Sequence, residues 1–264
     1  FDVVDILLES IFVNHWSVAS EAINALGSIG TDYALNALEK VMERYDELNP
    51  KVRIALAKSL GEFRNEKSFN MLVNIINREK NDLILSQAYW SIGKTKQKDA
   101  LEILKKGLNI QSWNESVRIG IVNGLGEIGN GACDIIKEYT KLGYNQRLRS
   151  ASAFALGKCG KDKRDVMELL CDLLKDYYLP VRRAAVSSLS KLKMYEAIEK
   201  LEQQFNMELD GRLKREIRVA IDSILKGKEE SEEMKNLREK IEEINKKLNE
   251  ITMKIEKIEK ELKK

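Results

Sequence analysis

The sequence predicts an all-α protein: an α-solenoid of stacked helical hairpins, followed by a long C-terminal coiled-coil helix. Of its 264 residues, 33% are charged and 6% aromatic, and only two prolines and fifteen glycines interrupt it, which favours helices. A leucine-like residue recurs every 31 to 34 residues. Beyond residue 226 the apolar residues follow a heptad spacing instead. Each of these patterns defines one part of the fold.

The first helix of each repeat carries the recurring residue, which we call the anchor. The anchors are Leu26, Leu60, Ile92, Leu125, Leu156, Leu189 and Ile221, and glycine follows directly in five of the seven copies. Eight residues before each anchor stands an aliphatic residue, the aliphatic start: Val18, Val52, Ile84, Val117, Leu148, Val181 and Leu213. A period of this length over seven copies is typical of a solenoid.

A second helix is predicted in each repeat by an apolar stripe at spacing i, i+3, i+7. Its central residues are Leu38, Leu72, Leu104, Ile136, Leu170 and Leu201. Neither helix can bury its stripe alone, so neighbouring pairs must stack into one continuous core.

The first helices also support a family resemblance. The pattern V-R-x-x-A-x-x-x-L-G, with Arg53, Arg118, Arg149 and Arg182 after the aliphatic start, resembles HEAT repeats of the short, phycobilin-lyase-like subclass over residues 1–226. The resemblance implies a right-handed superhelix whose second helices line the concave side. It implies no single function, because such repeats serve many unrelated systems.

The N-terminal residues 1–13 match the spacing of a second helix, and no first helix precedes them. A solenoid end normally carries a polar cap. We therefore expect the chain to be the C-terminal part of a larger protein, entering its solenoid in mid-repeat.

The C-terminal residues 227–264 are predicted to form a coiled-coil tail. Apolar residues alternate steps of three and four along an oligomerisation seam: Met234, Leu237, Ile241, Ile244, Leu248, Ile251, Ile255, Ile258 and Leu262. Self-association is the simplest way to cover this seam. The alternative is that the seam packs on the solenoid or on further parts of the parent protein.

Catalytic motifs are missing from the sequence. It has no H-E-x-x-H, Walker A or G-x-S-x-G pattern, and its only histidine, His15, excludes a histidine-based metal cluster. We expect no enzymatic activity and no cofactor, with His15 as a surface or capping residue. Three cysteines without a C-x-x-C pair, no signal peptide and no apolar run of membrane length indicate reduced thiols in a soluble, cytoplasmic protein.

Three rows of residues are candidate binding surfaces. The arginine row reads either as a ladder between repeats, which we favour, or as a phosphate track. If the second helices line the concave face, an acidic row there suits a basic peptide or protein surface, the alternative being a solvated face: Glu102, Asp134, Glu168 and Glu199. The third row is either packed against the next repeat or an exposed aromatic edge: Trp113, Tyr144 and Tyr177.

We expect an interaction and assembly scaffold that binds protein or peptide and self-associates through its tail. The run FDVVDILLESIFVNHWSVASEAINALGSIG also resembles the repeat-containing C-terminal regions of aminopeptidase-N-like zinc metallopeptidases, without their catalytic motifs. That resemblance implies, as an alternative, an accessory domain that shapes access to a peptidase site. A nucleic-acid-binding solenoid is the second alternative, and the net charge of +3 makes it the weaker one.

Overall fold

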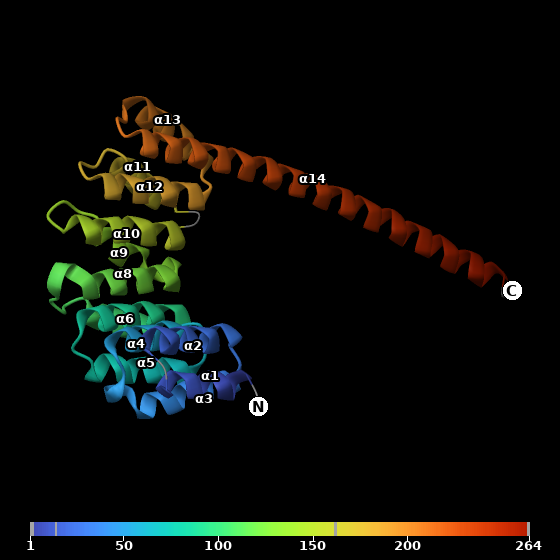
Figure 1. The fold of residues 1–264 in the computed structure, drawn as a ribbon. Helices are drawn as coiled ribbons and strands as arrows, with labels where there is room; N and C mark the ends of the chain where they lie inside the picture. Colours follow the sequence, from blue (N-terminus) through green and yellow to red (C-terminus); the bar gives the residue numbers. More distant parts are fainter. Residues whose placement is uncertain (1–2, 14, 161–162, 263–264) are drawn as a thin grey trace.

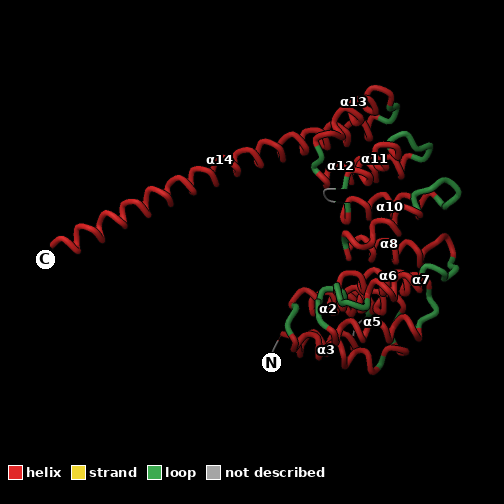
Figure 2. Tube along the Cα trace, turned by 180° about the vertical axis from the view of Figure 1, so that it is seen from behind, coloured by secondary structure: helices red, strands yellow, loops and turns green. Residues whose placement is uncertain are grey.

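In the computed structural model, which describes residues 3–13, 15–160 and 163–262, the regular elements are helices (Figures 1 and 2). The α-helices of the described residues are α1 (Val3–Val13), α2 (Trp16–Ile29), α3 (Asp32–Glu43), α4 (Pro50–Leu60), α5 (Glu66–Arg78), α6 (Asp82–Thr95), α7 (Ala100–Gly107), α8 (Ser116–Ile128), α9 (Cys133–Glu138), α10 (Gln146–Cys159), α11 (Arg164–Leu173), α12 (Leu179–Leu192), α13 (Ile198–Met207) and α14 (Gly211–Leu262). Short 3-10 turns lie between some of them: Tyr45–Glu47, Trp113–Glu115, Asn130–Ala132 and Tyr195–Ala197.

The helices alternate between two layers, as the repeat predicts. The even-numbered helices from α2 to α12 are the first helices, the odd-numbered helices from α3 to α13 are the second helices, and α14 begins as a further first helix. Figure 1 shows α6, α8, α10 and α12 stacked one above another, with α14 leaving the stack at its C-terminal end. The expected solenoid of helical hairpins is confirmed.

Asparagine and aspartate side chains start several first helices three residues before the aliphatic start. The side-chain oxygens of Asn49, Asn81, Asn145 and Asp210 accept backbone N–H bonds of the first turn at 2.8–3.0 Å. Such caps satisfy donors that the helix itself leaves unpaired. They fix where each first helix begins, and so keep the repeats in register.

Small residues let neighbouring first helices approach closely. The glycine after each anchor lies against the residue before the next anchor, so that a Cβ on Gly61 would stand 2.7 Å from the Cβ of Ser91. The approach is closest between α6 and α8, where a Cβ on Gly93 would stand 2.1 Å from the carbonyl oxygen of Gly124. Only glycine fits there, because the obstacle is backbone rather than a flexible side chain.

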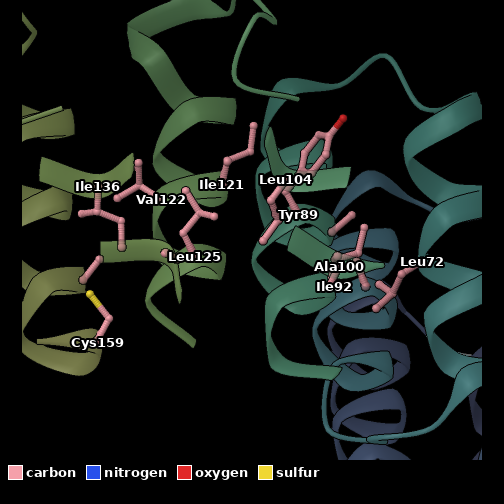
Figure 3. Packing of buried hydrophobic residues seen from close by; sticks show 14 of the residues in the cluster. Leu72, Tyr89, Ile92, Ala100, Leu104, Ile121, Val122, Leu125, Ile136 and Cys159 are labelled. Carbon is pink, nitrogen blue, oxygen red and sulfur yellow. The ribbon is translucent and has the colours of Figure 1, made fainter. Parts of the chain in front are cut away.

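The core is one continuous cluster that runs the length of the solenoid. Figure 3 shows Ile92 and Leu104 of one repeat and Leu125 and Ile136 of the next, all fully buried between the two helix layers. No hairpin has a core of its own, so the stability of each repeat depends on its neighbours.

The first helices occupy the inner side of the curve, which corrects the expectation that the second helices line the concave face. Consecutive first helices are in close contact along the whole array, whereas beyond the α3–α5 pair consecutive second helices make few contacts. The layer with the shorter spacing follows the shorter arc. The reason is local: the close contacts of glycine with glycine, serine or alanine of the next repeat join first helices.

Helix α14 contains the first helix of the last repeat and continues to Leu262, so the expected division between residues 226 and 227 falls inside it. The seam residues Met234, Leu237, Ile241, Ile244 and Leu248 are 49–63% exposed. The remaining seam residues lie outside the part of the chain whose side chains are described: Ile251, Ile255, Ile258 and Leu262.

The cysteines differ from the expectation of three reduced thiols. Cys133 at the start of α9 and Cys159 at the end of α10 form a disulfide, with their Cα atoms 5.8 Å apart. Stacking of consecutive repeats brings the two buried positions together, and their separation of 26 residues gave no sign of it. Cys171 is free, and burial raises the pKa of its thiol to about 11.

Candidate binding groove

A groove of about 770 Å³ crosses the first helices from α6 to α14. We call it the inner groove. It is lined by Trp90, Ile119, Asn123, Gln146, Arg147, Ser150, Ala151, Phe154, Pro180, Arg183, Ala184, Ser187 and Glu216. A smaller hollow of about 410 Å³ between α12 and α14 shares Ser187 and Glu216 with it and adds Lys191 and Arg215. Two adjoining hollows therefore lie on the first helices of the C-terminal repeats.

Trp90 and Glu127 are joined near one end of the inner groove. The Trp90 Nε1 donates a hydrogen bond of 3.2 Å to Glu127 Oε1, and the Lys158 ammonium donates to the same oxygen at 2.5 Å. Burial alone would raise the pKa of Glu127, but the bonds from Lys158 and Trp90 outweigh it and hold that pKa below its ordinary value. The three residues come from α6, α8 and α10, so the network spans three repeats.

The Phe154 ring lies close to the ammonium groups of two lysines. The Lys191 ammonium lies 3.6 Å from the centre of the Phe154 ring, and the Lys158 ammonium lies 5.7 Å from it and from the Trp90 ring. Burial and the charge of Lys158 lower the pKa of Lys191. Lys158 is bonded to the Glu127 carboxylate, while Lys191 feels its charge without a bond to it, beside two half-buried aromatic rings.

Sequence reasoning missed these residues, although a signal was present. In the five middle repeats, counting six residues on from the aliphatic start gives Lys58, Trp90, Asn123, Phe154 and Ser187, and counting ten gives Glu62, Lys94, Glu127, Lys158 and Lys191. Both offsets point toward the inner side. They carry information only once the first helices are known to line that side.

The arginine row forms clamps between repeats, as favoured from the sequence. The guanidinium groups of Arg53, Arg118, Arg149 and Arg182 each donate to a carbonyl of the loop before their own helix, at 2.8–3.0 Å. Arg182 also pairs with both oxygens of Glu208, at 2.9 and 3.1 Å. These guanidinium groups form hydrogen bonds within the solenoid, so the four arginines do not support the alternative of a phosphate-binding track.

The acidic row lies on the second helices, outside the inner groove. Glu102, Asp134 and Glu168 each pair with a base on their own helix, and Glu199 accepts a hydrogen bond from Gln203. Hydrogen bonds from Lys105 and Lys137 hold the pKa values of Glu102 and Asp134 below the ordinary range. The row therefore does not form a stripe of unpaired acid on a concave face, and its binding role stays a prediction.

The aromatic edge row divides in the structure. Trp113 and Tyr177 are 77% and 87% exposed in the loops before α8 and α12. Tyr144 is half-buried and packs against Tyr139, with ring centres 5.2 Å apart. Leu142 and Leu209 are also exposed in corresponding loops. The edge is thus apolar in four consecutive loops, and its use by a partner stays a prediction.

The remaining chemistry of the described residues is sparse. His15 caps the start of α2, where its ring nitrogen Nδ1 accepts the Ser17 N–H. Within residues 3–13, 15–160 and 163–262, no three histidine, cysteine or acidic side chains gather to hold a metal ion. In the same residues, none of the helices combines the length and apolar character that crossing a bilayer needs.

These features define the class: an α-solenoid repeat protein with a mixed aromatic and basic groove on its inner layer. The family model of HEAT repeats matches residues 41–113 and 142–222, more than half of the chain. The chain belongs to the HEAT-repeat family. No curated protein matches the sequence.

A solved structure supports the fold. The complex of CpcE and CpcF of phycocyanin lyase from Nostoc sp. PCC7120 is 20% identical, with a TM-score of 0.56, over 84% of this chain and 94% of that chain. Two further structures are less similar. A designed armadillo repeat protein in complex with the peptide (KR)4 is 15% identical, with a TM-score of 0.45, over 85% of this chain and 100% of that chain. Human deoxyhypusine hydroxylase in complex with glycerol is 14% identical, with a TM-score of 0.39, over 84% of this chain and 95% of that chain. The resemblance to aminopeptidase tails finds no support in these comparisons and stays a prediction.

Proposed function

We propose that this protein is a non-catalytic interaction scaffold that binds a segment of a partner protein in its inner groove. The observation that carries the proposal is the partly exposed group of Trp90, Phe154, Lys158 and Lys191, which three first helices, α6, α10 and α12, present at the inner groove and the hollow beside it. Aromatic side chains contribute most to binding when a partner excludes water from them. A structural core would instead bury these rings completely.

Selection from a random peptide library tests this function. Peptides enriched on the immobilised full-length protein are measured again on Phe154→Asp, which places a charge in the groove, and on Leu101→Asp, a matched change on the second-helix layer. Groove binding requires that Phe154→Asp abolish binding while Leu101→Asp, provided that it retains the wild-type circular dichroism, leaves it intact. Enriched peptides that bind Phe154→Asp as well as the wild type would refute the groove as the binding site.

We further propose two functional parts, the solenoid of residues 1–226 and a tail of residues 227–264 that self-associates as a coiled coil. The support is the exposure of five seam residues on α14, since an apolar stripe of this kind is stable in water only when covered. A second copy of the tail offers the complementary stripe. Pairing would also give the scaffold avidity for a repeated partner.

Sedimentation of the full-length chain tests self-association. Ile244→Asp places a charge in the seam, and Asn245→Asp places the same charge one residue away. We expect the first variant to sediment as a monomer and the second to keep the wild-type oligomer. A wild-type chain that is monomeric at high micromolar concentration contradicts the proposal.

The two alternative functions make different demands. An accessory role beside a zinc aminopeptidase requires that this chain change the cleavage of substrates by a peptidase encoded with it. Nucleic-acid binding requires retention on DNA that decreases with salt. The arginine clamps weaken the second alternative, because their guanidinium groups already pair within the loops.

A further inference from the structure

The charges on the inner face are unevenly neutralised. Lys94 pairs with Glu62 at 2.8 Å, Lys158 with Glu127, and Arg183 with Glu216. Three further cations line the inner groove or the hollow beside it without a carboxylate within salt-bridge distance among the described residues: Arg147, Lys191 and Arg215. The inner face therefore carries excess positive charge.

Lys191 is the most constrained of these cations. Its ammonium lies over the Phe154 ring and close enough to Lys158 to be affected by its charge, although the Lys191 residue as a whole is exposed. Glu127, the carboxylate whose charge acts on Lys191, is already bonded to Lys158 and to the Trp90 indole. A second carboxylate beside Lys191 would remove this imbalance, and the chain itself does not supply one within its described residues.

We propose that the inner groove recognises an acidic peptide segment, with one carboxylate held by Lys191 and Lys158 and an apolar side chain held between Trp90 and Phe154. This inference rests on the proposed function and names its class of partner. Charge-assisted hydrogen bonds are stronger than neutral ones, so we place the centre of recognition at this pair of lysines beside the Phe154 ring.

The pattern of charge favours a peptide over a nucleic acid. Glu62, Glu127 and Glu216 alternate with the cations along the same inner face. A phosphate backbone carries a charge at each nucleotide and would lie against these carboxylates. A peptide can place acidic and apolar side chains at separate positions, and so match both the lysines and the rings.

The groove also sets a length for its ligand. It crosses five first helices, and helices packed through small residues lie about 8 Å apart, which gives a path of about 32 Å. An extended chain rises about 3.3 Å per residue, so about ten residues span the groove. The ligand is therefore a short linear segment rather than a folded surface.

Fluorescence anisotropy with three labelled probes tests the inference. The probes are a twelve-residue peptide alternating glutamate with leucine and phenylalanine, the same peptide with lysine for each glutamate, and a twelve-nucleotide single-stranded oligothymidylate. We expect the acidic peptide to bind most tightly to the full-length chain. Tighter binding of the basic peptide or of the oligothymidylate, or binding of none, would overturn the inference.

Variants of the chain locate the binding. We expect Lys191→Gln to weaken the acidic peptide about tenfold, as the loss of one charge-assisted bond predicts, and Lys191→Arg to retain most of the affinity. Ser187→Glu, on the groove floor, should weaken it as well. Lys106→Gln, an exposed lysine of α7, is the control and should change nothing. Equal affinities for Lys191→Gln and the control, with wild-type melting temperatures, would overturn the inference.

The outcome separates the two proposals. If library selection enriches groove-dependent peptides that are not acidic, the scaffold function stands and the acidic-ligand inference fails. If no peptide depends on Phe154, both fail.

Discussion

Replacing Gly93 by alanine tests whether the first helices are held at their closest possible distance. The added Cβ would stand 2.1 Å from the carbonyl oxygen of Gly124 and 2.4 Å from its Cα, whereas unstrained atoms lie about 3.5 Å apart. Helices α6 and α8 must therefore separate by about 1 Å. Because the obstacle is backbone, overpacking costs about 2–3 kcal/mol here, the upper part of its usual range, and the better helix propensity of alanine returns about 1 kcal/mol.

We expect a net destabilisation of about 1–2 kcal/mol for Gly93→Ala, which lowers the melting temperature by about 2–8 °C for a chain of this size. Thermal unfolding followed by circular dichroism measures it. Gly211→Ala is the matched control, since a Cβ at that helix start meets no atom within 4 Å. A melting temperature of Gly93→Ala equal to or above that of Gly211→Ala would contradict the close approach of α6 and α8.

Three further predictions concern the links between repeats. Arg149→Met should destabilise the fold by about 3–5 kcal/mol, because Asp176 would stay buried without its partner; the two side chains are 3% and 4% exposed. Cys133→Ser should lower the free energy of unfolding by about 3 kcal/mol, as expected for opening a loop of this length, and reductant should not affect the variant further. Hydrogen bonds from Arg182, the Asp210 N–H and Gln204 outweigh burial and hold the pKa of Glu208 below its ordinary value of 4.5. The contribution of Glu208 to the free energy of unfolding should therefore be fully present above pH 4.5 and be lost as the pH falls through the folded-state pKa.

Each of these predictions has a control. Arg164→Met removes an exposed ion pair and should change stability by less than about 0.5 kcal/mol. Cys171→Ser should leave the effect of reductant unchanged, and an equal effect of reductant on Cys133→Ser would argue against the disulfide. Glu208→Gln should flatten the acid limb of the melting curve; a slope equal to that of the wild type would show that Glu208 contributes nothing to it.

Much of the fold could be predicted from the sequence because several residue patterns recur with the same period. The anchors, the glycines after them and the second-helix stripes each depend on contacts inside one hairpin or between adjacent hairpins. The inner side of the curve was predicted wrongly. The sequence shows that Gly93 and Gly124 are small, but not that they meet, and that contact decides which layer is inner.

The inner groove was less predictable for the same reason. Trp90 and Phe154 lie 64 residues apart in sequence and come together only through the stacking of α6, α8 and α10. The disulfide between Cys133 and Cys159 likewise depends on how two repeats are stacked. Periodicity gives the spacing along one helix, while these features depend on the rotation of one repeat against the next.

The backbone contacts between first helices also have a mechanical consequence. A layer whose helices touch through glycine can hardly be compressed, while the more widely spaced second helices can move. When the solenoid bends, the layer of first helices therefore keeps its length. Bending would then widen or narrow the outer face and leave the distances between Trp90, Phe154 and Lys191 nearly constant. A peptide bound as proposed would keep its contacts while the solenoid changes curvature.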